Sequence, residues 1–356
     1  MDELIPASAV NRSATAALRP DFPESGGVPL WMDASVRPDE QVRRLHQSLE
    51  SGTVPTGELY TSPYQASKWL AVHETWSPAR QCSTVQDLYD TFFEALNHKI
   101  QGQPWALVSL GCGGGQKEDR CLKAVRQPPE IALLLDISPT LAMVSYQRIS
   151  PWCRTHAGVI DLEANLGQPN WCHSLVASNG LGDNHPPLRR VLFFLGLLPN
   201  LPITAAWSLM RAWTTPGDYL VVSANLASEE EIALGLPSIL PQYDNRETRE
   251  WIAAFFELHG LQNVANEVFY KVEPVRKNET QMARIRVEWQ PKMPTRVELP
   301  GLTPIIWKSG QTICAFESLR MTARAVESLA SDHDLALRFQ KVDPSMQEGV
   351  FLFERT

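Results

Sequence analysis

Four closely spaced glycines stand between an apolar stretch and a segment of helical composition in the run VSLGCGGGQK: Gly111, Gly113, Gly114 and Gly115. Glycines at such a turn let backbone amides approach a bound ligand closely, because no side chains intervene. The dinucleotide pattern GxGxxG would require glycine at 116 or 118, where Gln116 and Glu118 stand. The turn therefore favours a ligand other than a dinucleotide, with a tight turn that binds nothing as the alternative.

Two carboxylates follow at the ends of the next two apolar stretches. Asp136 closes IALLLD, where it can accept hydrogen bonds from both ribose hydroxyls of an adenosine. Asp161 ends GVIDL, where it can accept from an adenine amino group while the backbone of Leu162 meets the ring edge. Each could instead be an exposed carboxylate at the end of a strand. Together with the glycine turn, they predict a nucleoside site at the carboxyl edge of a parallel sheet.

The elements that must position these residues alternate between strand and helix. A helix expected to start at Ser83, with Ser83 and Gln86 as a capping box, leads into the pattern. Continuous apolar strands indicate a parallel sheet covered on both faces. We expect these strands at 105–110, 131–136, 158–162, 191–196 and 218–226.

After Leu226 the hydrophobic period changes. MARIRVEWQ alternates apolar with charged residues, including Glu288, which is typical of an antiparallel strand with one wet face. The chain ends with a helix around 322–330 and two strands, DLALRFQKV and GVFLFERT. By fold analogy, a parallel sheet that ends in an antiparallel hairpin is typical of class I methyltransferases, whereas nucleotide-binding dehydrogenase domains usually end on a parallel strand.

These patterns predict an α/β protein with the Rossmann-like sheet of class I methyltransferases and an inserted α+β substrate domain. We expect an N-terminal arm and helix on the substrate side at 1–80, the first part of the cofactor domain at 81–226, the inserted domain at 227–316, and the closing helix and hairpin of the cofactor domain at 317–356.

Composition narrows the classes of partner. A net charge of -8 without a Lys/Arg cluster argues against binding to nucleic acid or an anionic membrane. The longest apolar run, from Val191, is broken by Pro199 and Pro202, and the first residues do not resemble a signal peptide. Six cysteines and eight histidines lack metal-binding spacing. We expect a cytoplasmic protein that acts on a small molecule and holds no metal.

From about Trp76 to the C-terminus, the sequence resembles the histidine-specific S-adenosylmethionine-dependent methyltransferases, the family of the ergothioneine-pathway enzyme that trimethylates histidine. The resemblance is carried by LGCGGGQK, LLLDISPTLA, VIDLEANL, RRVLFFLGLLPN, PGDYLVVSANL, PQYDN and SGQTICAFESLRMT. It implies S-adenosylmethionine as co-substrate, and the positions that match the family's contacts to it are Gly111, Lys117, Asp136, Asp161 and Leu162. The turn itself adds Gly113 and Gly115.

On the substrate side the sequence departs from that family. A family tyrosine matches Ser77, a glutamate that receives the substrate's charged amine matches Phe316, and an acidic residue matches Ser109. Family substrate positions are retained at Tyr243, Asn200 and Ser318. We expect Ser77, Tyr243, Phe316 and Ser318 to line the substrate site, with Phe316 as its wall, and we expect Tyr243 and Asn200 to orient the reacting group.

Three functions are consistent with this sequence. Methyl transfer needs mainly an acceptor lone pair aligned behind the sulfonium methyl group, so a small-molecule methyltransferase that acts on an amine of an amino-acid-like metabolite is the leading hypothesis. Attack on the carbon chain beside the sulfonium would instead release methylthioadenosine, by closing an azetidine-2-carboxylate ring or by transferring an aminobutanoyl group. A non-catalytic binding module is the third, and it would be favoured by an exposed apolar patch containing Trp207 and Trp213.

Overall fold

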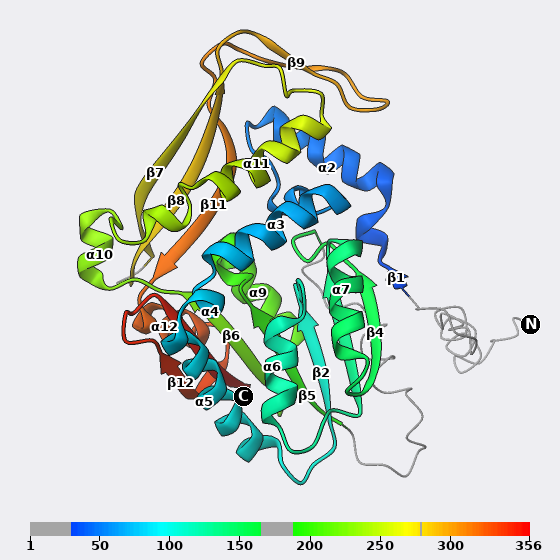
Figure 1. Cartoon of the computed structure of the whole chain (residues 1–356), viewed down its shortest axis with the longest axis vertical. Helices are drawn as coiled ribbons and strands as arrows, with labels where there is room; N and C mark the ends of the chain where they lie inside the picture. Colours follow the sequence, from blue (N-terminus) through cyan, green and yellow to red (C-terminus); the bar gives the residue numbers. More distant parts are fainter. Residues whose placement is uncertain (1–29, 165–187, 278–279) are drawn as a thin grey trace, which may run out of the picture.

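The computed structural model describes residues 30–164, 188–277 and 280–356. Its centre is an eight-stranded sheet in the order β1-β4-β3-β2-β5-β6-β13-β12 (Figure 1). In that order the strands are Leu30–Met32, Arg154–Val159, Ile131–Asp136, Trp105–Leu110, Arg189–Leu195, Tyr219–Asn225, Glu348–Arg355 and Leu335–Val342.

Strand direction in this sheet confirms the predicted fold class. The pairs from β1 to β6 are all parallel, whereas β13 runs antiparallel to both β6 and β12. The closing hairpin therefore completes the Rossmann-like sheet of class I methyltransferases. The edge strand β1 is an addition that the sequence pattern did not predict, because only three residues pair with β4.

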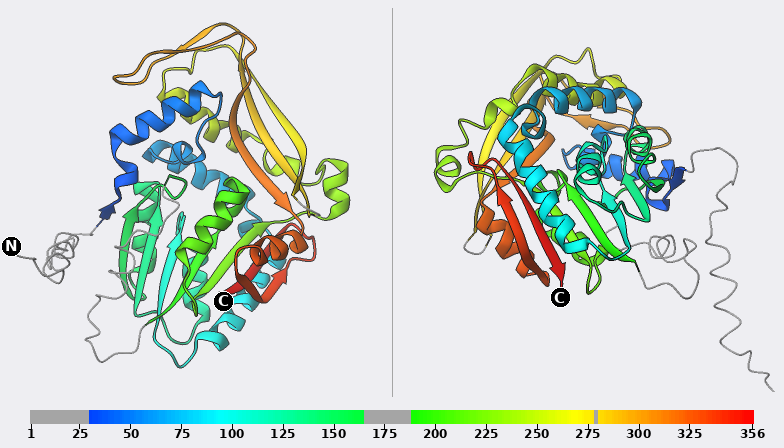
Figure 2. Two further views of the ribbon diagram at one scale, coloured as in Figure 1. Left: turned by 180° about the vertical axis from the view of Figure 1, so that it is seen from behind. Right: turned by 60° about the horizontal axis from the view of Figure 1, so that its bottom comes forward.

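Helices cover both faces of the sheet (Figures 1 and 2). One face packs against α5 (Ser83–Ile100), α6 (Gln116–Ala124) and α7 (Pro139–Ile149), and the other packs against α9 (Ile203–Trp213) and α12 (Ala323–Ser331). Successive residues of β2 divide between the two cores: Leu107 lies in the first, and Val108 and Leu110 lie in the second. The strands are thus buried on both sides, which explains their continuous apolar sequences.

Two local predictions were wrong. Helix α5 begins at Ser83, but Cys82 occupies the N-cap without a side-chain bond, and Gln86 donates instead to the Arg80 carbonyl at 2.7 Å. Helix α4 (Pro78–Gln81) ends directly before Cys82, whose extended backbone puts it at the N-cap, so Ser83 is already the first helical residue. The third predicted strand, 158–162, is observed as β4 and ends at Val159, so Asp161 lies in the following loop.

A second, antiparallel sheet stands beside the first, in the order β11-β8-β7, with bounds Ile313–Met321, Thr280–Pro291 and Asn266–Lys277. Smaller elements accompany it: α10 (Glu229–Leu234), η4 (Leu240–Gln242), α11 (Arg246–Leu258), β9 (Thr295–Val297) and β10 (Ile305–Trp307). The alternation predicted for MARIRVEWQ holds except at Glu288, which is buried and ion-paired to Lys271 at 2.5 Å. Strand β11 continues past residue 316 to Met321.

The N-terminal segment packs with this second sheet. It contains η1 (Ala34–Val36), α2 (Pro38–Glu50), η2 (Thr56–Leu59) and α3 (Pro63–Trp76). Leu45 and Leu49 of α2 share a core with Ile285 of β8, and Figure 1 shows α2, α3 and α11 gathered above the edge of the parallel sheet. A capping box does occur at the start of α3, where Ser62 and Gln65 bond reciprocally.

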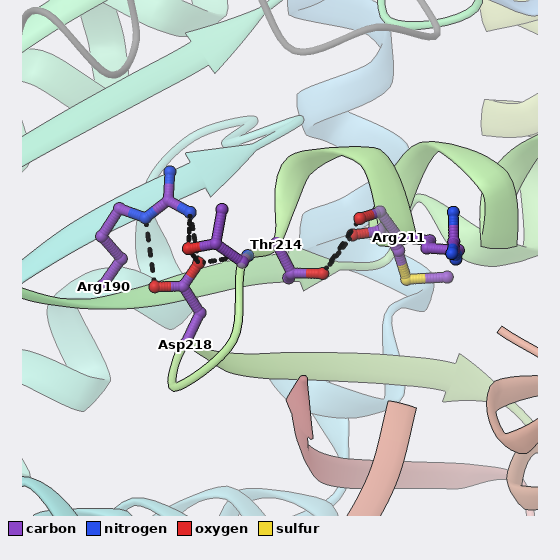
Figure 3. Close-up of polar contacts among 6 residues, drawn as sticks. Arg190, Arg211, Thr214 and Asp218 are labelled. Carbon is purple, nitrogen blue, oxygen red and sulfur yellow. Dashed lines mark hydrogen bonds and ion pairs between the residues drawn. The ribbon is translucent and has the colours of Figure 1, made fainter. Parts of the chain in front are cut away.

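At the opposite end of the parallel sheet, where β5 and β6 begin, a buried ion pair joins Arg190 and Asp218 (Figure 3). Arg190 Nε donates to Asp218 at 3.1 Å, and Thr215 donates its backbone N–H to the same carboxylate at 2.6 Å. The pair therefore stabilises the turn that leads into β6 and lies away from the edge at which the parallel strands end. No helix in the part of the chain that the structure describes is long and apolar enough to cross a membrane.

Candidate functional site

A deep pocket lies at the carboxyl ends of the parallel strands, between the two sheets and beneath α3. Six residues predicted to bind the co-substrate line it: Gly111, Gly113, Lys117, Asp136, Asp161 and Leu162. All five residues predicted for the substrate side line it too: Ser77, Asn200, Tyr243, Phe316 and Ser318. Tertiary folding thus brings into one cavity residues that span positions 77 to 318.

The glycine turn leaves β2 in a conformation that side chains disfavour. Gly111 and Gly113 have φ of 68° and 52°, in the left-handed region. A Cβ at Gly113 would come within 3.0 Å of the Trp69 ring. Gly115, predicted to contact the co-substrate, does not line the pocket; its φ is 70°, and a Cβ there would lie 2.6 Å from Ser145 Oγ. Gly115 therefore serves the close packing of α6 on α7.

Asp136 ends β3, lines the pocket and is held by the backbone. Its Oδ2 accepts from Gly113 N at 2.8 Å, and its Oδ1 accepts from Ser138 N at 2.9 Å. A carboxylate offers about four lone-pair sites, so about two remain for hydroxyl donors from a ligand. Burial raises the pKa of Asp136 to about 6, while these backbone donors act in the opposite direction. The group is therefore an anchored acceptor that is ionised above pH 6.

Asp161 is fixed by the N-terminal segment. Arg44 of α2 pairs with its Oδ2 at 3.0 Å, and its Oδ1 accepts from the backbone N–H groups of Glu163 and Ala164 at 3.0 Å. Ser35 Oγ accepts from the Asp161 backbone N–H at 3.0 Å. No sequence pattern indicates a role for Arg44, because its partner Asp161 is 117 residues away.

A buried polar network surrounds Tyr243 on the facing wall. Its hydroxyl lies 3.1 Å from Ser318 Oγ and accepts from Asn225 Nδ2 at 3.4 Å and from Arg320 Nε at 3.2 Å. Arg320 is 2% exposed and lines the pocket. Its other partners among the described residues are Gln242 Oε1 and two backbone carbonyls, so no negative charge balances it there. Sequence reasoning missed this arginine, which sits two residues beyond Ser318.

The remaining predicted substrate residues form the walls. Phe316 packs edge-on against Trp251 of α11, with ring centroids 5.2 Å apart. Asn200 ends the short helix η3 (Leu198–Asn200), and its carbonyl accepts from Thr56 Oγ1 at 3.2 Å. Ser77 follows α3 and caps α4. The pocket therefore carries an apolar wall beside the polar pair Tyr243 and Ser318.

Lys117 turns toward the β6 and β13 side of the pocket. Its Nζ lies 3.6 Å from Glu348 Oε1, 3.3 Å from Ser223 Oγ and 4.9 Å from the centroid of the Tyr89 ring. The charge of Lys117, after burial itself, contributes to lowering the pKa of His73 to about 3, so the imidazole that lines the pocket is neutral. Lys117 thus gives a fixed positive charge to this wall.

A buried carboxylate that the sequence analysis did not select lies beside the turn. Glu118 of α6 is 3% exposed, lines the pocket, and accepts from Ser109 Oγ at 2.6 Å. It brings a carboxylate to the side chain of Ser109, where the family resemblance predicted an acidic residue. The signal that could have found it is its place on the first turn of α6, directly after the glycines.

The described residues contain no group of three or more histidine, cysteine, aspartate or glutamate side chains that could hold a metal ion. The five cysteines in that part of the chain are free.

No model of a known protein family matches the chain, and no curated protein matches it. Among solved structures, it is similar to an S-adenosylmethionine-dependent methyltransferase from Clostridium acetobutylicum ATCC 824, at 8% identity over 81% of this chain and 98% of that chain, with a TM-score of 0.40. It is also similar to magnesium protoporphyrin IX methyltransferase from Synechocystis PCC 6803 with bound SAM, at 8% identity over 82% of this chain and 90% of that chain, with a TM-score of 0.39. A third similar structure is a sugar N-methyltransferase from Streptoalloteichus sp ATCC 53650, at 9% identity over 80% of this chain and 92% of that chain, with a TM-score of 0.37. Similarity at this level identifies neither an activity nor a substrate, and the resemblance to the histidine-specific family stays a prediction.

Proposed function

We propose that the protein is an S-adenosylmethionine-dependent transferase that methylates a small molecule, an amine of an amino-acid-like metabolite. The observation that carries this proposal is that one pocket is lined both by Asp136, which is bonded to the glycine turn, and by the polar pair Tyr243 and Ser318. The first end suits the nucleoside of the co-substrate, and the second suits a polar acceptor. Bound S-adenosylmethionine would supply an electrophilic methyl group.

Tyr243 serves in this proposal as a hydrogen-bond donor that orients the acceptor. Its oxygen accepts from both Asn225 and Arg320, so its own proton is free to point to Ser318 or to a bound molecule. Asn200 lines the same pocket. Because methyl transfer depends mainly on alignment at near-attack distance, such positioning groups can supply much of the rate enhancement.

The charge of the acceptor end supports an amino-acid-like substrate. Arg320 is buried without an acidic partner among the described residues, and it reaches the acceptor end through the Tyr243 hydroxyl. A substrate carboxylate near this group would gain a favourable interaction in a medium of low dielectric constant. The apolar wall of Phe316 and Trp251 would exclude water from the amine.

The same apolar wall favours a second candidate, release of methylthioadenosine by attack on the carbon chain beside the sulfonium. Phe316 stands where the resembling family has a carboxylate, and an amine against two aromatic rings is held in its neutral, nucleophilic form. The non-catalytic module loses the feature that would favour it. Trp207 and Trp213 are both fully buried and form no surface patch.

One incubation separates these functions. The pure protein is mixed with S-adenosylmethionine alone and then with a set of amino acids, and the adenosine product is identified by mass spectrometry. Adenosylhomocysteine that depends on an added amine supports methyl transfer. Methylthioadenosine formed without an acceptor contradicts it and supports cyclisation, and unchanged co-substrate despite measured binding supports the module.

Tyr243→Phe is the matched variant for the acceptor end. It removes the proton donor and keeps the ring, which packs in the core that Leu45 and Leu49 share with Ile285. We expect it to bind adenosylhomocysteine within about twofold of the wild type and to turn over about fivefold to tenfold more slowly, since one hydrogen bond contributes up to about 1.5 kcal/mol. Wild-type turnover in this variant would show that Tyr243 does not orient the acceptor.

A further inference from the structure

We propose that Glu118 holds the positively charged amino group of the methionine part of the co-substrate, an inference that rests on the proposed function. Glu118 stands on the first turn of α6, directly after the glycine turn, and its side chain lines the pocket. Its side-chain partner is neutral, the Ser109 hydroxyl at 2.6 Å. A primary ammonium group is the complement that this carboxylate lacks.

Sheet order places Glu118 on the path of the ligand. Strands β4 and β3 carry the nucleoside side of the pocket, Asp161 and Asp136, and the next strands in the sheet are β2 and β5. A ligand whose ribose lies at Asp136 therefore extends across the end of β2 when it runs toward the acceptor wall. Ser109 lies near that end of β2, paired with Leu134 on one side and Phe193 on the other. Glu118 is hydrogen-bonded to Ser109, so its carboxylate lies close to the end of β2 that such a ligand would cross.

The other carboxylates of the pocket are already compensated or exposed. Asp136 accepts two backbone N–H groups, and Asp161 is ion-paired with Arg44. Glu348 lies 3.6 Å from Lys117 and accepts the Tyr89 hydroxyl at 2.5 Å. Glu163 is exposed beside Asp161. Among the lining carboxylates that the structure describes, Glu118 is thus the buried one without an ion pair and without two backbone donors.

Burial of a carboxylate without a cation is unfavourable, and burial raises the pKa of Glu118 above its usual value, while Ser109 and Lys117 act in the opposite direction. A bound ammonium group would supply the missing positive charge at the site. Interaction between an ammonium group and a desolvated carboxylate is strong because the local dielectric constant is low. The cost of burying Glu118 in the free protein would then be offset on binding.

The experiment compares two ligands that share the nucleoside and differ in the amino-acid part. Adenosylhomocysteine carries the amine, whereas methylthioadenosine does not, and both are titrated calorimetrically into wild type and Glu118→Gln. We expect the variant to bind adenosylhomocysteine at least tenfold more weakly and methylthioadenosine within about twofold of the wild type. Equal losses for both ligands, or no loss for either, would overturn the proposal.

A wild-type measurement keeps the proposal testable if the variant does not fold. Deaminated adenosylhomocysteine, with hydrogen in place of the amino group, should bind the wild type at least tenfold more weakly than adenosylhomocysteine, and equal affinities would refute the role of Glu118. In a folded Glu118→Gln protein, the double variant with Ser109→Asp should recover most of the discrimination, and its failure to do so would count against a carboxylate contact. A wild-type protein that binds none of these nucleosides refutes the proposed function itself.

Discussion

Replacement of Asp136 by asparagine keeps the shape of the side chain and removes one acceptor oxygen together with the charge. In the wild type, two of about four lone-pair sites accept Gly113 N–H and Ser138 N–H, and the others are open to ribose hydroxyls. Hydrogen bonds to a charged group contribute about 1.5–3 kcal/mol each. Loss of one such bond and weakening of the other predicts a loss of about 3 kcal/mol in nucleoside binding, or about 100-fold in affinity.

Stability should change much less, because two effects oppose one another. Asparagine turns an amide group toward one of the backbone donors, which costs about 1–3 kcal/mol. It also removes a buried charge: burial raises the pKa of Asp136 from 3.8 to about 6, which corresponds to about 3 kcal/mol against the folded state above pH 6. The free energy of unfolding is therefore expected to change by less than about 2 kcal/mol.

The assay pairs calorimetric titration of methylthioadenosine at pH 7.5 with urea denaturation of the same samples. A folded Asp136→Asn protein with about 100-fold weaker binding supports the assignment. Binding within threefold of the wild type would refute the nucleoside site at the end of β3.

Three further predictions concern Asp136, the Arg190–Asp218 ion pair and Arg320. As pH falls from 7 to 5, protonation of Asp136 should weaken methylthioadenosine binding about tenfold in the wild type and leave binding by Asp136→Asn unchanged. The contribution of Asp136 to the free energy of unfolding should decrease as pH rises from 3.8 to 6. Profiles of binding and stability that do not change with pH would exclude titration of Asp136 in this range. Asp218→Asn removes the carboxylate charge that is paired with buried Arg190 and should cost about 3–5 kcal/mol in urea denaturation, with unchanged affinity for adenosylhomocysteine; weaker binding would mean that this ion pair influences the distant pocket (Figure 3). Arg320→Met removes the hydrogen bonds that Arg320 donates to the Leu226 and Gln347 carbonyls, so we expect a loss of about 1–3 kcal/mol in the free energy of unfolding. We also expect a larger rise in KM for the acceptor than in the Kd of methylthioadenosine, and equal changes would assign Arg320 a purely structural role.

The sequence by itself determined where the buried strands lie and which edge of the sheet carries the pocket, namely the edge at their carboxyl ends. Strands buried on both faces read as continuous apolar runs, so IALLLD and VLFFLG could be placed without a structure. Because parallel strands end at one edge, Asp136 and the glycine turn could be predicted to meet, and Gly113 N does bond to Asp136. The prediction of a cap at Ser83 was wrong, since Cys82, which follows a short helix that no periodicity reveals, occupies the cap position.

Only the tertiary structure decided which polar groups share the cavity and which buried charges have a partner of opposite charge. Arg44 meets Asp161 across 117 residues, and Arg320 meets Tyr243 across 77. Hydrophobic period reports which face of an element is buried, but the partner of a buried charge is set by the packing of distant elements. For the same reason, only the folded structure shows that Glu118 lacks an ion pair. Its neutral partner Ser109 and the ion pairs of Asp161 and Glu348 are all set by tertiary packing.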